Sequence, residues 1–337
     1  MRILAVETSC DDTAVALLEG CSAIAERVYS QTVHGEHGGV VPELASRSHM
    51  KVLPAMVDDV LAAGGMTDAG GIDVFAATAG PGLVGSLLVG LSWTKAAAWA
   101  LGKPFLGINH LAAHLFVHYG ASRTVQFPAV ALLVSGGHTC LFRMGSWDEI
   151  TLIGSTRDDA AGESFDKTAK LTGLGYPGGA LLDSAADRGD PDAVSLPSPM
   201  SDPAVPDFSF SGLKTAAKLA WERGADLNDL AASFRRTVVD LLVSKLFYQC
   251  EVLGARSVLA AGGVTANRLL RRVLEEESIK HGVRLFIPDS EHAMDNALMV
   301  GRAAAAVLDS DPSATSPLSC NAFARWSGSS LTPLCCH

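Results

Sequence analysis

The chain lacks any segment typical of a secretion signal or of a membrane span. No basic region precedes an apolar stretch at the N-terminus, and glycine, serine and lysine interrupt the richest apolar run, at 83–100. The seven cysteines are odd in number and include no Cys-x-x-Cys pair, which indicates reduced thiols and argues against a cysteine zinc site. These absences predict a soluble, cytoplasmic protein that does not bind a membrane.

Positive charge is also scarce. The formal net charge is −10 at pH 7, the wrong sign for binding nucleic acid over the whole surface. Nucleic-acid binding would therefore need a local patch or the charge of a partner. Two interpretations stay open for the basic residues of the second half, a local track or solvated helix faces. The residues concerned are Lys214, Lys218, Arg223, Arg268, Arg271 and Arg272.

With 337 residues, 48% of them hydrophobic and 18% charged, the chain is long enough for two hydrophobic cores. Apolar runs rich in β-branched residues alternate with helical stretches, which is typical of an α/β fold. We therefore expect two α/β domains.

Three strand-and-turn units organise the chain. Residues 2–18 contain two apolar strands joined by an acidic turn, and residues 129–142 repeat this layout with a glycine turn. This similarity indicates an internal duplication. In the third unit a buried strand, 257–261, leads through Gly262 and Gly263 into a helix, a turn that can bring backbone close to a nucleotide. Each glycine pair taken singly is more often a plain tight turn.

His110 and His114 stand four residues apart after a good N-cap, Asn109. At this spacing both side chains lie on one face of a helix and can bind one metal ion. Leu111 occupies the position where the zinc-protease motif His-Glu-x-x-His has its glutamate, which argues against a metalloprotease. Two ordinary histidines remain the alternative until a third ligand is found.

A series of sequence segments covers about the first 300 residues in order. They are Val6–Asp12 (VETSCDD), Gly38–His49, Ala79–Gly90, His110–His114, Leu132–Thr139 (LLVSGGHT), Asp158–Lys170, Tyr176–Gly179, Phe208–Thr215 (FSFSGLKT), Ala261–Arg268 and Asp295-Asn296. With these segments the chain resembles the two-lobed ATP-binding fold of actin, sugar kinases and heat-shock chaperones. Within that fold, it most resembles the tRNA N6-adenosine threonylcarbamoyltransferases, the TsaD family, formerly named O-sialoglycoprotein endopeptidases.

The resemblance implies a two-lobed actin-like ATPase fold, a duplicated ribonuclease H-like domain, with nucleotide and metal in the cleft between the lobes. The first lobe would comprise residues 1–127 and 297–337, and the second lobe residues 128–296. Asp295, at the end of the second lobe, would then lie beside His110 and His114 of the first lobe. The metal ion would be bound by residues of both lobes and would link them across the cleft.

The resemblance also implies the ligands. His110, His114 and Asp295 would hold one divalent metal ion, Fe(2+) first and Zn(2+) as the alternative, and such a set leaves positions open for water or phosphate oxygens. Asp295 could instead be the N-cap of the next helix. An ATP- or AMP-type nucleotide would contact Leu133, Val134, Ser135, Gly136 and Gly137 through its phosphates, Asp166, Gly179 and Asp183 around its ribose, and Asn267 at its base.

The reaction implied is acyl transfer from threonylcarbamoyl-AMP to the exocyclic amine of adenosine 37, in tRNAs that read codons starting with A. Asp11 or Asp12 would be the general base, and Asp11 is favoured because its side-chain length matches the family. Many relatives have glutamate where Asp12 and Ala112 stand here. The implied partners are tRNA, a shorter relative of the same fold that binds a helical surface of the first lobe, and a P-loop ATPase.

Three alternatives stay open at this point: a sugar kinase of the same fold, an O-carbamoyltransferase of the same fold, and a nucleotide-controlled scaffold. A sugar kinase has no use for a histidine pair, so His110 and His114 argue against it. Arg325-Trp326 resembles the family's closing pair, whereas the terminal Cys335-Cys336-His337 matches nothing in the family and is expected to be a disordered tail.

Overall fold

The structure is a computed structural model, and it describes residues 1–325, 328 and 331. Trp326 and the terminal Cys335-Cys336-His337 lie outside the described residues. The chain forms two compact units. The first unit comprises Met1–Thr124, Trp147–Glu149 and Met294–His337, and the second unit comprises Val125–Ser146 and Ile150–Ala293.

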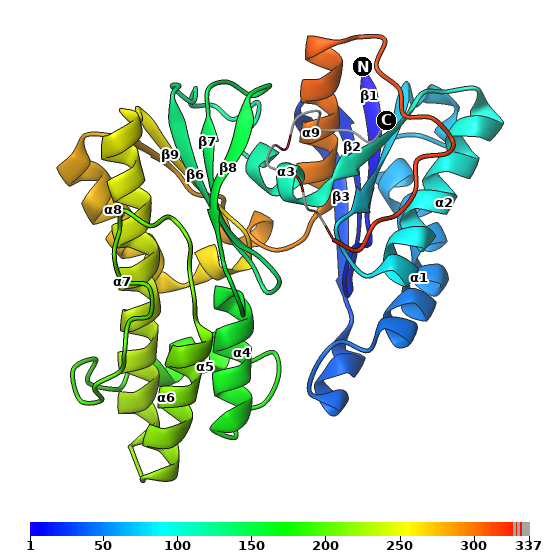
Figure 1. The fold of residues 1–337 in the computed structure, drawn as a ribbon. Helices are drawn as coiled ribbons and strands as arrows, with labels where there is room; N and C mark the ends of the chain where they lie inside the picture. The colour runs from blue at the N-terminus through cyan, green and yellow to red at the C-terminus, as the bar shows by residue number, and fades with distance from the viewer. Residues whose placement is uncertain (326–327, 329–330, 332–337) are drawn as a thin grey trace. The chain divides into compact units, whose positions relative to one another are not determined.

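Each unit has a five-stranded mixed sheet (Figure 1). The first sheet has the order β3-β2-β1-β4-β5, with strands β1 (Arg2–Glu7), β2 (Asp12–Glu19), β3 (Ser22–Ser30), β4 (Val74–Gly80) and β5 (Phe105–Asn109). The second sheet has the order β10-β9-β6-β7-β8, with strands β6 (Ala129–Val134), β7 (Thr139–Met144), β8 (Ile150–Ser155), β9 (Ser257–Ala261) and β10 (Arg284–Phe286).

The two sheets have the same topology. In the first, β1 pairs antiparallel with β2 and parallel with β4, and in the second, β6 pairs antiparallel with β7 and parallel with β9. Both hairpins predicted from the sequence are confirmed, and so is the duplication that they indicated.

The helices of the first unit are α1 (Pro42–Ala63), α2 (Val84–Leu101), α3 (His110–Phe116) and α9 (Ala297–Ser310). Those of the second unit are α4 (Ala161–Leu171), α5 (Gly179–Ala186), α6 (Ser211–Glu222), α7 (Leu227–Leu253) and α8 (Arg268–His281). Short 3-10 helices cover Thr32–His37, Ala69–Gly71, Gly263–Ala266 and Ser290–His292.

In the first unit the helices cover both faces of the sheet. Leu4 and Val15 pack with residues of α1 and α2 in one hydrophobic cluster, while α9 contacts β1 and β2 from the other face (Figure 1). This contact is close, because a Cβ on Gly301 of α9 would lie 2.3 Å from the Cδ1 atom of Leu18. The backbone of α9 therefore rests directly on the first sheet.

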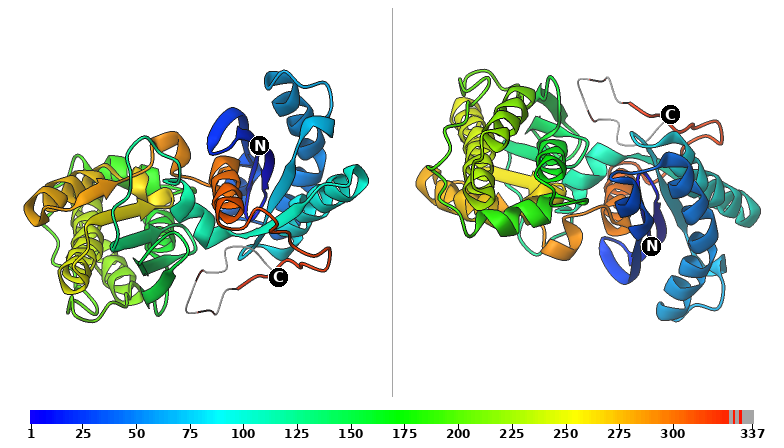
Figure 2. Two further views of the ribbon diagram at one scale, coloured as in Figure 1. Left: turned by 90° about the horizontal axis from the view of Figure 1, so that it is seen from above. Right: turned by 90° about the horizontal axis from the view of Figure 1, so that it is seen from below.

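In the second unit one hydrophobic core joins the sheet to residues of all five helices, with α7 in contact with β6 and α8 in contact with β10. Val130, Leu132 and Val134 of β6 share one buried cluster with residues of α4 to α8, grouped beside this sheet in both views of Figure 2. Alternate residues of a strand point to one face, so this cluster fixes the register of β6 and the position of the turn that follows it.

One described helix, α2, is long and apolar enough to cross a membrane, with a mean hydropathy of 1.2. A single such helix is weak evidence, because the core helix of a soluble protein passes the same test. Here α2 contacts β4 and α1, and Leu87 and Leu91 belong to the buried core.

Candidate active site

The helix that carries the two histidines begins as predicted. Asn109 ends β5 and caps α3, where its Oδ1 atom accepts hydrogen bonds from the backbone N–H groups of Leu111 (2.9 Å) and Ala112 (3.3 Å). His110 and His114 follow one turn apart, both buried, with ring centroids separated by 4.7 Å. The spacing therefore places both rings on one face, as the sequence indicated.

Asp295 reaches the same place from the start of α9. Its Oδ1 atom lies 3.2 Å from Nε2 of His114 and 3.7 Å from Nε2 of His110. The alternative role as a helix cap falls to Asn296, whose Oδ1 atom accepts a hydrogen bond of 2.9 Å from the backbone N–H of Met299. The structure thus brings the third candidate ligand to the histidine pair.

Asp295 falls in the first unit together with both histidines, whereas the sequence-based boundary had placed it at the end of the second lobe. The units divide at Thr124/Val125 and Ala293/Met294, whereas the sequence-based boundaries were 127/128 and 296/297. The reason is that Asp295 lies two residues before α9, which packs on the first sheet. The three residues form a site within one unit.

These residues fit a divalent metal ion. One ligand atom from each of the three residues can be chosen so that all lie within 4.8 Å of one another. Metal ligands lie about 2 Å from a zinc-like ion, so neighbouring ligand atoms are expected a little more than 3 Å apart. The Nε2 atom of His114 is buried and makes no hydrogen bond among the described residues, although Oδ1 of Asp295 lies 3.2 Å from it. In a ring that carries its hydrogen on Nδ1, this nitrogen can bind an ion.

The electrostatics of His110 also reflect its neighbours. Burial of the ring opposes its charged form, but the carboxylates of Asp295 and Glu7 outweigh burial and raise the pKa of His110 to about 9. A histidine binds a metal through a neutral ring, so binding of an ion through His110 would require loss of a proton from this ring at neutral pH.

Asp11 and Asp12 lie at the turn between β1 and β2. Asp12 is the first residue of β2 and pairs with Ser30 of β3. The pKa of Asp12 is raised to about 7, mainly by burial of its carboxyl group. The hydrogen bond with Ser30 lowers this pKa, whereas the nearby carboxylates of Asp295, Asp11 and Glu7 raise it further. A carboxylate with such a pKa can accept a proton near neutral pH.

The glycine turn follows β6, of which Leu133 and Val134 are the last residues. The backbone N–H of Ser135 donates to the carbonyl of His138 (2.8 Å), and the Ser135 hydroxyl accepts from the His138 N–H (3.1 Å). Gly136 and Gly137 are exposed, and a Cβ on either would meet nothing within 4 Å. Packing within the chain therefore does not require glycine at either position, and the exposed backbone of the turn leaves room for a ligand.

Two further glycines hold the backbone against this turn. Gly162, the second residue of α4, donates its N–H to the carbonyl of Ser135 (3.2 Å), and a Cβ there would lie 2.5 Å from that oxygen. Gly262 has a φ of +91°, and a Cβ there would lie 2.4 Å from the carbonyl oxygen of Val134. Neither position leaves room for a side chain.

The remaining nucleotide candidates gather around α5. Oδ1 of Asp166 accepts hydrogen bonds from the N–H groups of Gly178 (2.8 Å) and Gly179 (3.0 Å) at the start of α5. Oδ1 of Asp183 accepts from Arg235 and from the Asn267 amide, both at 2.7 Å. Asn267 also caps α8 through its own Oδ1 atom (2.9 Å to the N–H of Leu270), so its side chain is engaged at both ends.

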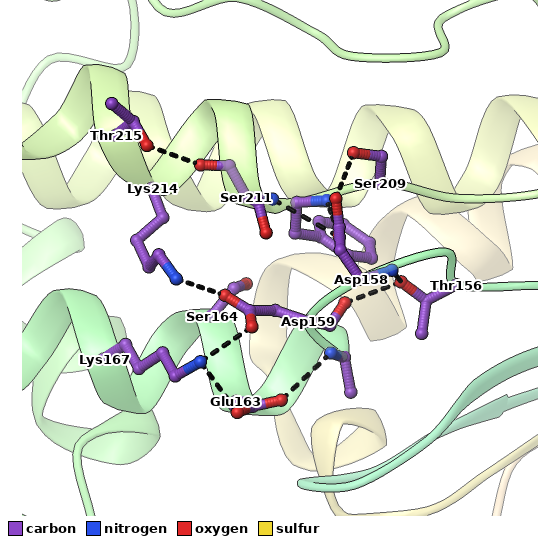
Figure 3. Close-up of polar contacts among 12 residues, drawn as sticks. Thr156, Asp158, Asp159, Glu163, Ser164, Lys167, Ser209, Ser211, Lys214 and Thr215 are labelled. Atoms are coloured by element: carbon purple, nitrogen blue, oxygen red, sulfur yellow. Dashed lines mark hydrogen bonds and ion pairs between the residues drawn. The ribbon is translucent and has the colours of Figure 1, made fainter.

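A polar network fixes the loop before α4 (Figure 3). The carboxylate of Asp159 pairs with Lys167 of α4 (2.7 Å) and Lys214 of α6 (2.5 Å). Asp158 accepts hydrogen bonds from the Ser209 hydroxyl (2.6 Å) and the Phe210 N–H (2.8 Å) just before α6. This network holds the start of α4, and with it Gly162, against the glycine turn.

Sequence reasoning missed Glu7, Gly162 and Arg235. Glu7 was visible as an ionisable residue that ends an otherwise apolar strand, and Gly162 as a glycine at the start of a predicted helix. Nothing in the local sequence indicates that Arg235 lies beside Asp183, 52 residues away.

Comparison with known proteins agrees with the resemblance. The family model for TsaD, tRNA N6-adenosine threonylcarbamoyltransferase, matches residues 22–302. Among curated proteins, the tRNA N6-adenosine threonylcarbamoyltransferase of Thermotoga neapolitana is 46% identical over 90% of this chain and 93% of its own. The protein of the same name from Ralstonia pickettii is 45% identical over 93% of both chains.

Solved structures show the fold. HypF of T. kodakarensis aligns with 92% of this chain and 48% of its own, at a TM-score of 0.64 and 14% identity. Component A of the (R)-2-hydroxyglutaryl-CoA dehydratase of Acidaminococcus fermentans aligns with 91% of this chain and 99% of its own, at a TM-score of 0.55 and 15% identity. The predicted two-lobed ATPase-type α/β fold is confirmed.

Proposed function

The chain belongs to the tRNA N6-adenosine threonylcarbamoyltransferase family. We propose that His110, His114 and Asp295 hold the metal ion used in this tRNA modification. The family decides against the sugar kinase, O-carbamoyltransferase and scaffold alternatives. The observation that carries the proposal is the group of His110, His114 and Asp295, in which one buried imidazole nitrogen has no hydrogen-bond partner in the described part of the chain.

The reaction is transfer of the threonylcarbamoyl group from threonylcarbamoyl-AMP to the exocyclic amine of adenosine 37. The amine nitrogen forms a bond to the carbamoyl carbon, the bond from that carbon to the phosphate oxygen breaks, and AMP leaves with the electron pair. The amine loses one proton. Its lone pair is delocalised into the ring, so catalysis depends mainly on positioning and on stabilising developing charge.

His110, His114 and Asp295 would hold a divalent ion, Fe(2+) or Zn(2+), with coordination positions left open. Bound there, the ion supplies Lewis-acid stabilisation of charge on the carbonyl or phosphate oxygens. The glycine turn Ser135–Gly137 would hold the phosphate of the adenylate through its exposed backbone. Asp166 and Asp183 would form the part of the site that binds the ribose. Asp166 would act by holding the start of α5 through its hydrogen bonds with Gly178 and Gly179.

The direct test measures transfer of labelled threonine to tRNA by the purified protein, with and without the partners proposed below. We expect labelled tRNA that requires adenosine 37. Absence of label with every partner present would contradict the assignment.

Asp12 is the residue we propose as general base. Only the deprotonated carboxylate accepts a proton, so a pKa of about 7 makes the single-turnover rate from preformed threonylcarbamoyl-AMP rise with pH up to about 7 and level off above it. The variant Asp12→Asn is expected to lose this rise and to fall about 100-fold in plateau rate. Asp11→Asn is the matched control and should keep the inflection. If Asp11→Asn removes it instead, the base is Asp11.

Most of the basic residues considered as a possible track are paired within the chain. Lys214 pairs with Asp159, Arg268 with Asp187, Lys218 with Glu222 and Arg272 with Glu276. These pairings favour the interpretation as solvated helix faces. A partner that contributes positive charge to tRNA binding is therefore part of the proposal, together with a P-loop ATPase.

The surface proposed for the shorter relative is an apolar groove between α1 and α2. Met50, Leu53 and Pro54 line it from α1, and Leu88 and Trp93 line it from α2. Met50 is 65% exposed and Leu88 is 47% exposed. A relative of the same fold would carry two corresponding helices, and two such apolar faces would pack as a four-helix arrangement.

Leu88→Glu is expected to weaken binding of this partner about 100-fold or more, because an unpaired charge buried in the contact costs at least about 3 kcal/mol. Analytical gel filtration with the purified partner measures the loss. Ile279→Glu is the control, since Ile279 of α8 is 81% exposed and lies in the second unit. Equal binding by the wild type and Leu88→Glu would place the interface elsewhere.

A further inference from the structure

Glu7 is a fully buried carboxylate at the end of β1. Its Oε1 atom accepts a hydrogen bond from the N–H of Ser9, and its Oε2 atom accepts one from the Thr78 hydroxyl of β4 (2.5 Å). Nδ1 of His110 lies 3.2 Å from the same Oε2 atom. A buried charge is costly unless it is paired and hydrogen-bonded, so these three donors explain how Glu7 is tolerated.

The contact with His110 also sets the chemistry of the ring. An ionised carboxylate is only an acceptor, so Nδ1 of His110 must carry the hydrogen of this bond. In a neutral imidazole the other nitrogen, Nε2, then has the lone pair. That nitrogen is the one that lies 3.7 Å from Asp295. The Ser9 hydroxyl, 3.3 Å from Nδ1, can donate or accept and selects neither form.

We propose that Glu7 is a positioning residue that fixes the tautomer and ring orientation of His110, so that Nε2 points to the metal position beside His114 and Asp295. This inference rests on the proposed metal site. It assigns to Glu7 a role through His110, without contact with the substrate. Partners of this kind typically change metal affinity by about 10- to 100-fold when they are replaced.

The test titrates the full-length protein with Co(2+) alone and follows the visible d–d absorption. Glu7→Gln is expected to bind Co(2+) about 10- to 100-fold more weakly, with an altered band pattern, because the amide no longer requires hydrogen at Nδ1. Glu7→Asp, which keeps the charge on a shorter arm, should recover part of the affinity. Thr13→Val is the matched control, since it removes another buried hydrogen bond, 2.7 Å from the Thr13 hydroxyl to Nδ1 of His49.

Several outcomes would overturn the proposal. An unchanged affinity and spectrum in Glu7→Gln would overturn the role of Glu7 while the metal site stands. Failure of the wild type to bind Co(2+) would overturn both. Should Glu7→Gln not fold, 15N chemical shifts of the histidines in the Zn(2+)-bound wild type decide the matter. Hydrogen on Nδ1 of His110 and metal on Nε2 would support the proposal, and the reverse would refute it.

Discussion

Replacing His110 or Asp295 with alanine is expected to abolish threonylcarbamoyl transfer. With three protein ligands, loss of one leaves two, which cannot fix the position of an ion. Loss of electrostatic stabilisation of a developing charge typically costs about 100- to 1,000-fold in rate. The measurement is single-turnover transfer from preformed threonylcarbamoyl-AMP, together with the metal content of each variant.

Lys218→Ala is the control for this pair of substitutions. Lys218 is exposed on α6 and lies 3.7 Å from Glu222, a surface pair that contributes little. We expect its transfer rate to stay close to that of the wild type. A near wild-type rate for His110→Ala would mean that the ion is structural or absent, and the catalytic role would pass to the acidic turn and the glycine turn.

Substitution of Gly162 by alanine is expected to weaken binding of AMP about tenfold or more. The added Cβ would lie 2.5 Å from the carbonyl oxygen of Ser135 and 2.9 Å from Cα of Gly136, so the glycine turn must shift. Forcing extra atoms into a tight contact costs about 1–3 kcal/mol, and about 1.4 kcal/mol corresponds to a tenfold change in affinity. Isothermal titration calorimetry with AMP measures this change.

Gly212→Ala is the matched control for Gly162→Ala. Gly212 is likewise the second residue of its helix, α6, but a Cβ there meets only the Cγ atom of Pro199, at 3.3 Å. Its AMP affinity should not change. Equal affinities for the two variants would show that the glycine turn does not hold the phosphate, or that it adapts to the shift.

Local sequence patterns were enough to predict much of the fold. The alternation of β-branched runs with turn residues identified both hairpins because strand pairing across a short turn depends on neighbouring residues. In the same way, the four-residue spacing of His110 and His114 after Asn109 was enough to place both rings on one helix face. These features could be predicted because each depends on residues close together in the chain.

The tertiary structure decided the features that depend on residues far apart. Asp295 joins the histidines because α9 packs on the first sheet, and Glu7 contacts His110 across 103 residues because β5 and β1 both pair with β4. The raised pKa of Asp12 comes from burial, whereas the sequence argument had favoured Asp11 on side-chain length. Burial and distant contacts arise only when the chain is packed, so residue types and spacings determine which groups are present, and packing determines which of them meet.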